Sequence, residues 1–213
     1  MIANRKSAQM YNERIGRFVG IAFLCLAVIQ PSDLFALQEH ARGGWLLGVS
    51  LGSGPGKYED SMADVSSSEP GGLITFRVGR MIQPSLLLEA ELTGWAREEE
   101  ASEAYEEGTL LSNLALAGTF YPLDPLSLLG GVYVRAGIGS GAITNILTSK
   151  VNSIALSTTE TGLGFLLGAG FELRVTKKFA LGVGVSFDKL SIGGEVYESA
   201  QFIGYALDFN WYL

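Results

Sequence analysis

The 213-residue sequence contains one cysteine, one histidine and few charged residues. Charged residues make up 17% of the chain, against about 25% in ordinary soluble domains, while hydrophobic residues make up 47%. Beyond residue 36 there is no uncharged apolar run of about 18 residues, which excludes membrane-spanning helices there. The cysteine, Cys25, lies in an N-terminal apolar segment, so the chain beyond that segment can form neither a disulfide nor a thiolate metal site.

The first 36 residues follow the order of regions in a secretory signal peptide. An apolar run at 18–29, too short to anchor the chain across a bilayer, is preceded by basic residues: Arg5, Lys6, Arg14 and Arg17. Leu34-Phe35-Ala36 offers a cleavage site before Leu37. We therefore predict a cleavable signal peptide over residues 1–36, starting at Met1 or Met10, and a single domain over residues 37–213.

The predicted domain is acidic, with 11 basic and 20 acidic residues and a net charge of −9. A chain with this charge lacks the electrostatic footprint of a nucleic-acid-binding protein. The sequence contains no zinc-ligand spacing, phosphate-binding glycine loop or nucleotide fingerprint. We therefore predict no nucleic-acid partner, no cofactor and no metal site.

Eight segments alternate between apolar residues and small or polar residues. They cover about 44–53, 72–80, 85–95, 109–121, 131–139, 160–173, 179–188 and 201–213. Successive residues of a strand point to opposite faces, and the strands of a membrane barrel are apolar outward and small or polar inward. The pattern predicts an all-β fold: an eight-stranded antiparallel up-and-down transmembrane β-barrel.

The connections between these segments predict the orientation of the barrel. Long connections follow the odd segments, at 54–71, 96–108, 140–159 and 189–200, and shorter ones follow the even segments, at 81–84, 122–130 and 174–178. Short periplasmic turns and long external loops alternate in this way, so we expect both chain ends on the periplasmic side. The first two long loops are acidic. The third is the most apolar, and either extends the barrel above the membrane or presents an adhesive edge.

Charged residues on the inward faces predict an ion network. An eight-stranded barrel is just wide enough for side chains to fill, and buried charges must pair. Two arginines are expected to share the lumen with four carboxylates: Arg77 and Arg135 with Glu89, Glu91, Glu172 and Asp208. We expect Arg77 to lie near Glu89 or Glu91, because their strands are neighbours. With arginines available, the Glu89 and Glu91 pair is interpreted as structural rather than as acid–base machinery.

The leader, the alternating strands, the glycine-rich inner faces and the aromatic last strand resemble the small outer-membrane barrels typified by outer membrane protein A and outer membrane protein X. Segments 132–139 and 205–213 carry the resemblance most clearly. It implies location in the outer membrane and contact with outer-membrane lipids and lipopolysaccharide. It also implies recognition of the last strand by the barrel assembly machinery, through Tyr205, Leu207, Phe209, Trp211 and Leu213, although Leu213 stands where the family has phenylalanine. Trp45 and Trp211 are expected to lie at the membrane interface.

These features favour a structural or surface-interaction protein over an enzyme. Outer-membrane barrel enzymes resemble one another in using histidine with serine or aspartate partners at the external rim. His40 precedes the first predicted strand and is expected on the periplasmic side, so no catalytic residue is predicted. We predict a barrel with a filled lumen whose acidic external loops meet an unknown surface ligand. The alternative is a secreted, soluble, lipocalin-like barrel, in which the apolar faces would line a cavity for a small apolar ligand.

Overall fold

The computed structural model describes residues 44–60, 69–99, 105–124, 127, 129–149, 155–194 and 197–213. The predicted signal peptide at 1–36 and His40 lie outside these residues. Within the described part of the chain, no helix is long and apolar enough to cross a membrane.

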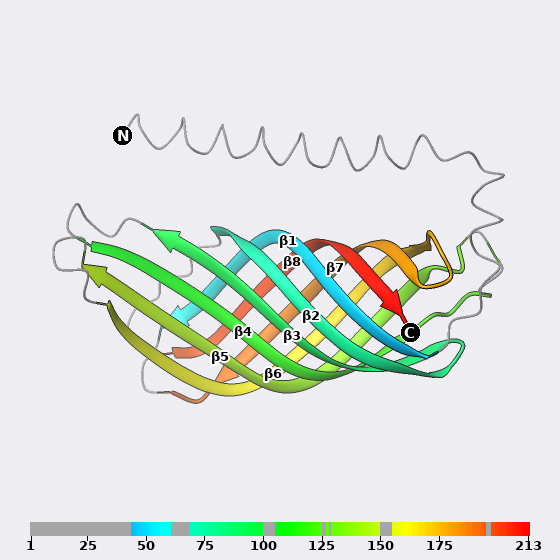
Figure 1. Cartoon of the computed structure of the whole chain (residues 1–213). Coiled ribbons are helices and arrows are strands. Elements are labelled where there is room, and N and C mark those ends of the chain that lie inside the picture. Colours follow the sequence, from blue (N-terminus) through cyan, green and yellow to red (C-terminus); the bar gives the residue numbers. More distant parts are fainter. Residues whose placement is uncertain are drawn as a thin grey trace.

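The described residues form one closed antiparallel barrel of eight strands (Figure 1). The strands are β1 Trp45–Asp60, β2 Glu69–Gln83, β3 Leu86–Glu99, β4 Tyr105–Phe120, β5 Val132–Ser149, β6 Ala155–Arg174, β7 Phe179–Ile192 and β8 Tyr197–Tyr212. Each strand pairs with the next along the chain, and β8 closes the barrel by pairing with β1. The predicted fold class, strand number and up-and-down order are therefore confirmed.

The apolar faces of the strands point away from the barrel axis. Large apolar side chains such as Leu47, Phe76 and Leu116 are exposed, Leu116 by 74%. Their neighbours along the same strands, such as Arg77 and Ala115, point inward and are buried. This arrangement suits a barrel surrounded by lipid. It is the opposite of the arrangement that the lipocalin-like alternative requires.

The strands run farther than the hydrophobic pattern predicted. The connections predicted at 54–71, 96–108, 140–159 and 189–200 shorten to 61–68, 100–104, 150–154 and 193–196. The predicted strict alternation of connection lengths is wrong, because the connection at 121–131, after β4, is the longest. Backbone pairing continues where both faces of a strand are polar, and there apolar alternation no longer marks the strand. Residues 140–149 and 155–159 extend the barrel as parts of β5 and β6, which is the first of the two roles predicted for this segment.

Both described chain ends lie at one end of the barrel, which we call the terminal end; the opposite one is the distal end (Figure 1). The first and last strands are joined at the terminal end by two backbone hydrogen bonds. The Trp45 amide donates to the Leu213 carbonyl at 3.0 Å, and the Leu213 amide donates to the Trp45 carbonyl at 2.8 Å. Gly44 precedes this closure with a φ of 81°, and a Cβ there would lie 1.9 Å from the Leu213 oxygen. Glycine is therefore required at this position.

Candidate functional site

The lumen of the barrel is filled by side chains in three layers. The terminal cluster is apolar and tyrosine-rich, and consists of Leu46, Met81, Leu87, Tyr121, Tyr133, Ala180 and Tyr212. The distal cluster is apolar and consists of Leu73, Trp95, Leu111, Ile143, Leu190, Ile192, Tyr197, Ala200 and Phe202. Between them lies a central layer of buried charged and polar side chains.

Arg135 on β5 forms the shortest ion pair of the central layer. Its Nη1 atom lies 2.5 Å from Oε2 of Glu91, and its Nε atom lies 4.0 Å from Oε1 of Glu89. Arg135 is only 8% exposed and Glu91 only 3%, so both charges are removed from bulk water. Charge-assisted hydrogen bonds of this kind are stronger than neutral ones. Glu89 also accepts a hydrogen bond from Thr119.

Arg77 on β2 joins three strands. Its Nη2 atom donates to the amide oxygen of Asn210 at 2.8 Å and lies 3.6 Å from Asp208. Its Nη1 atom lies 3.9 Å from Glu89. Asp208 accepts hydrogen bonds from the hydroxyls of Ser50 at 2.6 Å and Tyr133 at 2.7 Å. Arg77, Arg135, Glu89, Glu91 and Asp208 thus form one connected group.

Glu172, the remaining predicted lumen carboxylate, is linked to this group through an amide. Asn210 donates to Glu172 at 2.7 Å while its own carbonyl oxygen accepts from Arg77. The hydroxyl of Tyr212 also donates to Glu172, at 2.7 Å. Arg174 lies over the ring of Tyr212, at 3.8 Å from its centroid.

Several lumen partners are uncharged and are not identified by the charge pattern of the sequence. Asn210, Tyr133 and Ser50 bridge the charged groups, and Asn113 donates to the buried carboxylate of Asp188 at 2.8 Å. The sequence places all of them on inward faces, so their parity along each strand is the signal that identifies them. Which carboxylate each would bind depends on strand register, which the sequence does not give.

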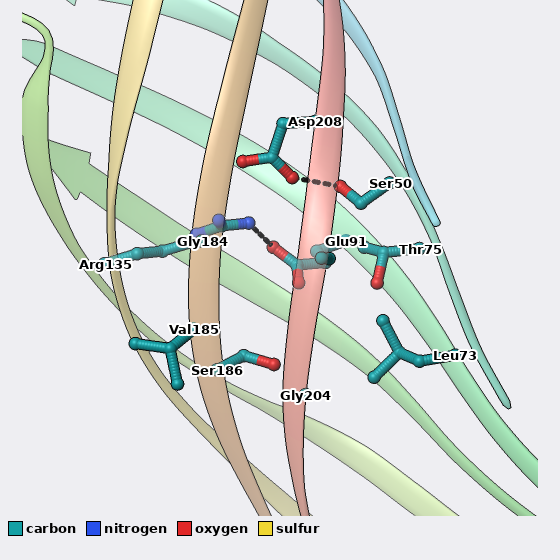
Figure 2. Close-up of a pocket in the computed structure, with 11 residues that line it drawn as sticks. Ser50, Leu73, Thr75, Glu91, Arg135, Gly184, Val185, Ser186, Gly204 and Asp208 are labelled. Atoms are coloured by element: carbon teal, nitrogen blue, oxygen red, sulfur yellow. Dashed lines mark hydrogen bonds and ion pairs between the residues drawn. The ribbon is translucent and has the colours of Figure 1, made fainter. Parts of the chain in front are cut away.

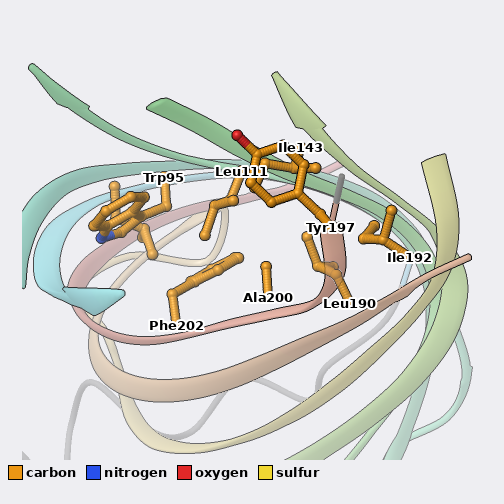
Figure 3. Close-up of a cluster of buried hydrophobic side chains, with 9 residues drawn as sticks. Trp95, Leu111, Ile143, Leu190, Ile192, Tyr197, Ala200 and Phe202 are labelled. Carbon is orange, nitrogen blue, oxygen red and sulfur yellow. The ribbon is translucent and has the colours of Figure 1, made fainter. Parts of the chain in front are cut away.

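The distal cluster was not predicted either, because apolar residues were assigned to the outward face. Trp95, Leu111, Ile143 and Leu190 project into the barrel from four strands (Figure 3). The indole N–H of Trp95 donates to the Gly54 carbonyl at 2.8 Å, which satisfies its one polar atom. Each of these residues lies an even number of positions from polar lumen residues on its own strand and so shares their face, as Trp95 does with Thr93.

A small cavity remains between the central layer and the distal cluster. Figure 2 shows the Arg135–Glu91 and Asp208–Ser50 contacts beside it, with Leu73 and Ser186 on its wall. Its volume of about 20 Å³ accommodates about one water molecule. Among the described residues, no group of three or more histidine, cysteine, aspartate or glutamate side chains is placed to hold a metal ion.

The predicted interfacial and assembly residues lie on the outer surface, from the middle of β8 to the terminal end. Trp45 is 52% exposed and lies under the guanidinium of Arg80, at 5.8 Å. Trp211 is 42% exposed and contacts Phe179, with ring centroids 5.3 Å apart. The predicted assembly residues share the outward face of β8 and its end: Tyr205, Leu207, Phe209, Trp211 and Leu213.

The model of the family described as outer membrane protein beta-barrel domain matches residues 21–209. The chain belongs to this outer-membrane β-barrel family. The protein is accordingly located in the bacterial outer membrane, as predicted. The orientation, with the terminal end of the barrel on the periplasmic side and the distal end outside the cell, stays a prediction from the sequence.

Solved structures of Ail show the same fold at low sequence identity, and that of Neisserial surface protein A is also similar. Ail, the attachment invasion locus protein of Yersinia pestis, in complex with the heparin analogue sucrose octasulfate, is 13% identical, with a TM-score of 0.51 over 78% of this chain and 99% of that one. Ail without that ligand is 14% identical, with a TM-score of 0.50 over the same shares of both chains. Neisserial surface protein A is 16% identical, with a TM-score of 0.48 over 80% of this chain and 97% of that one. No curated protein matches the chain.

Proposed function

We propose that this outer-membrane barrel is a sealed scaffold that acts at the cell surface through its acidic external end, and that it is neither a pore nor an enzyme. The observation that carries the proposal is the filled lumen. Two apolar clusters enclose the charged layer, and the cavity between them has a volume of only about 20 Å³. A hydrated solute has no continuous route through such a barrel.

The external end supplies the charge for a surface interaction. The distal parts of the strands carry acidic residues, among them Glu59, Glu98, Glu106, Glu107, Glu160 and Glu198. The periplasmic turn between β6 and β7 instead carries Lys177 and Lys178. Because complementary charge accelerates and selects encounters, the favoured surface ligand is positively charged.

The lumen network has a structural role in this proposal. Arg77 and Arg135 neutralise carboxylates that the barrel wall buries; Arg77 contacts residues of β3 and β8, and Arg135 contacts residues of β3. The small cavity beside Glu91 leaves no room for a substrate. We therefore assign no catalytic role to the carboxylates of the central layer.

The outward face of β8 has a separate role in biogenesis. We propose that Tyr205, Leu207, Phe209, Trp211 and Leu213 form the signal that the barrel assembly machinery reads. Support comes from their position: they lie on one face of the strand that closes the barrel onto β1. The backbone of Leu213 also exchanges two hydrogen bonds with the backbone of Trp45, so the end of the signal takes part in closing the barrel.

Two measurements test the proposed function. The first records single-channel currents of the refolded protein in planar bilayers; we expect no sustained conductance, and a stable open channel would refute the sealed lumen. The second measures polylysine binding to neutral phosphatidylcholine vesicles that carry the protein. A variant with Glu59, Glu98, Glu106 and Glu107 changed to glutamine should lose most of this binding. The control Asp124→Asn, at the periplasmic end, should keep it; equal binding by all three proteins would refute the acidic surface.

A further inference from the structure

We propose that Lys57, Gln201 and Lys189 form a binding site for the phosphate of a lipid headgroup in the outer leaflet. These residues lie on the outward surface of β1, β8 and β7, away from the lumen. The inference depends on the outer-membrane location and is independent of the ligand proposed for the acidic end.

Strand register places the three side chains in one row. Gln201 pairs with Lys57 on β1 and with Lys189 on β7. Neighbouring strands lie about 4.8 Å apart, so the two lysine backbones are separated by about 10 Å. Both side chains follow the outward parity of their strands, and Gln201 lies between them. Two ammonium groups and one amide N–H₂ can therefore converge on one phosphate, which accepts hydrogen bonds from all of them.

The row lies at the depth of the outer headgroups. Lys189 is ten residues beyond Phe179 on β7, and Lys57 is twelve residues beyond Trp45 on β1. At about 3.3 Å per residue and a tilt of about 40°, these positions are about 25 and 30 Å above the periplasmic aromatic residues. The apolar band of such a barrel is about 25 Å tall. Both ammonium groups thus lie just beyond the hydrocarbon.

The outward residues next to the row show the same boundary. Two residues along each strand toward the membrane, the outward residues are Pro55, Ile203 and Phe187. Two residues along each strand away from the membrane, the outward residues are Glu59, Ser199 and Ser191. On β7 and β8 the change from apolar to polar therefore occurs at the lysine row; on β1 it begins at Ser53, before Lys57.

The lysine charges are available to a ligand. Lys57 makes a long, solvent-exposed ion pair with Glu59 at 4.0 Å, without a hydrogen bond, while Glu59 accepts a hydrogen bond from Ser199 at 2.8 Å. Among the described outward-facing residues of the distal half, Lys57 and Lys189 are the two basic ones. Within the described outward surface of this end they form a localised positive site, which attracts an anion at this depth.

The test compares lipid binding by the full chain folded in a neutral detergent. The probe is lipid A carrying both of its phosphates, and native mass spectrometry gives the affinity of the bound lipid. The variant Lys57→Gln with Lys189→Gln should bind it about thirtyfold more weakly, because each lysine near an anionic headgroup contributes about a fivefold change. Lipid A from which the phosphates have been removed should bind the wild-type protein as weakly as phosphorylated lipid A binds the variant.

The matched control is Lys177→Gln with Lys178→Gln, which removes the same charge from the periplasmic turn and should leave binding unchanged. Equal affinity of wild type and the Lys57/Lys189 variant would overturn the proposal, and so would an equal loss in the control. Inorganic phosphate alone forms a separate arm. If it bound with the same dependence on Lys57 and Lys189, the site would be one for soluble anions, and the assignment to lipid would be wrong. Unchanged heat-dependent gel mobility should show that all variants fold, since these side chains point away from the lumen.

Discussion

Removal of the Arg135 charge provides the most direct test of the lumen network. In Arg135→Met the side chain keeps much of its length but loses its ion pair with Glu91, which lies 2.5 Å away and is almost fully buried. Removing one partner of a buried pair costs about 3–5 kcal/mol, because the other charge stays buried without compensation. Glu89 and Asp208 would then share Arg77 as their remaining arginine in the central layer. We expect the free energy of unfolding to fall by about 4 kcal/mol.

The assay is urea unfolding of the protein folded in phosphatidylcholine vesicles, followed by tryptophan fluorescence and by heat-dependent gel mobility. Arg80→Met is the matched control, since Arg80 lies on β2 but points outward over Trp45. Its loss should cost about 1 kcal/mol or less. The double variant Arg135→Met with Glu91→Gln should recover part of the stability, because it also removes the carboxylate charge. If Arg135→Met were as stable as Arg80→Met, or if the double variant were no better than the single one, the network would not have the proposed structural role.

Three further outcomes are expected. Trp95→Ala should lower the free energy of unfolding in the same urea assay by about 3–5 kcal/mol. Trp95→Phe should lower it by only about 1 kcal/mol, because this variant loses mainly the hydrogen bond to the Gly54 carbonyl. Equal losses in the two variants would contradict this. Gly71→Ala should cost about 1–3 kcal/mol because its Cβ would lie 2.4 Å from the Trp95 ring, whereas Gly72→Ala, with no atom within 4 Å, should cost less. Deleting residues 211–213 should reduce the protein found in urea-washed outer membranes, and Leu213→Phe should not; normal membrane levels after the deletion would argue against the assembly signal.

The sequence was sufficient to predict the fold because outward and inward residues differ so clearly within the membrane. Leu114, Leu116 and Phe120 alternate with smaller or polar residues on β4, and every strand repeats this contrast. Beyond the apolar band that contrast disappears. In segment 140–149 small, polar and apolar residues occur on both faces, so the strand continues while its hydrophobic signal ends.

The lumen was only partly predictable for a different reason. Charge alone indicated that Arg77 and Arg135 lie among carboxylates, but the partner of each depends on register and on side-chain reach. Arg135 contacts Glu91, and Arg77 reaches Glu172 through Asn210, a neutral residue that no charge argument selects. The hydrophobic pattern does not identify Trp95 as a lumen residue, because an apolar residue is expected to face lipid; its inward position follows from its place two residues after Thr93.

The length of the β5–β6 hairpin has a consequence for ionic strength. Leu163 is the last large apolar residue on the outward face of β6, and Ala155 lies eight residues beyond it, which is about 20 Å along the membrane normal. The Debye length at physiological salt is about 8 Å, so the charge of the membrane surface is screened at this tip. The hairpin there is rich in hydroxyl groups, with Thr144 and Thr159 in contact at 3.0 Å. A ligand held by neutral hydrogen bonds at this tip would stay bound as salt is raised, whereas a positively charged ligand held by the glutamate-rich strands would be released, so a salt titration of ligand binding to whole cells separates the two sites.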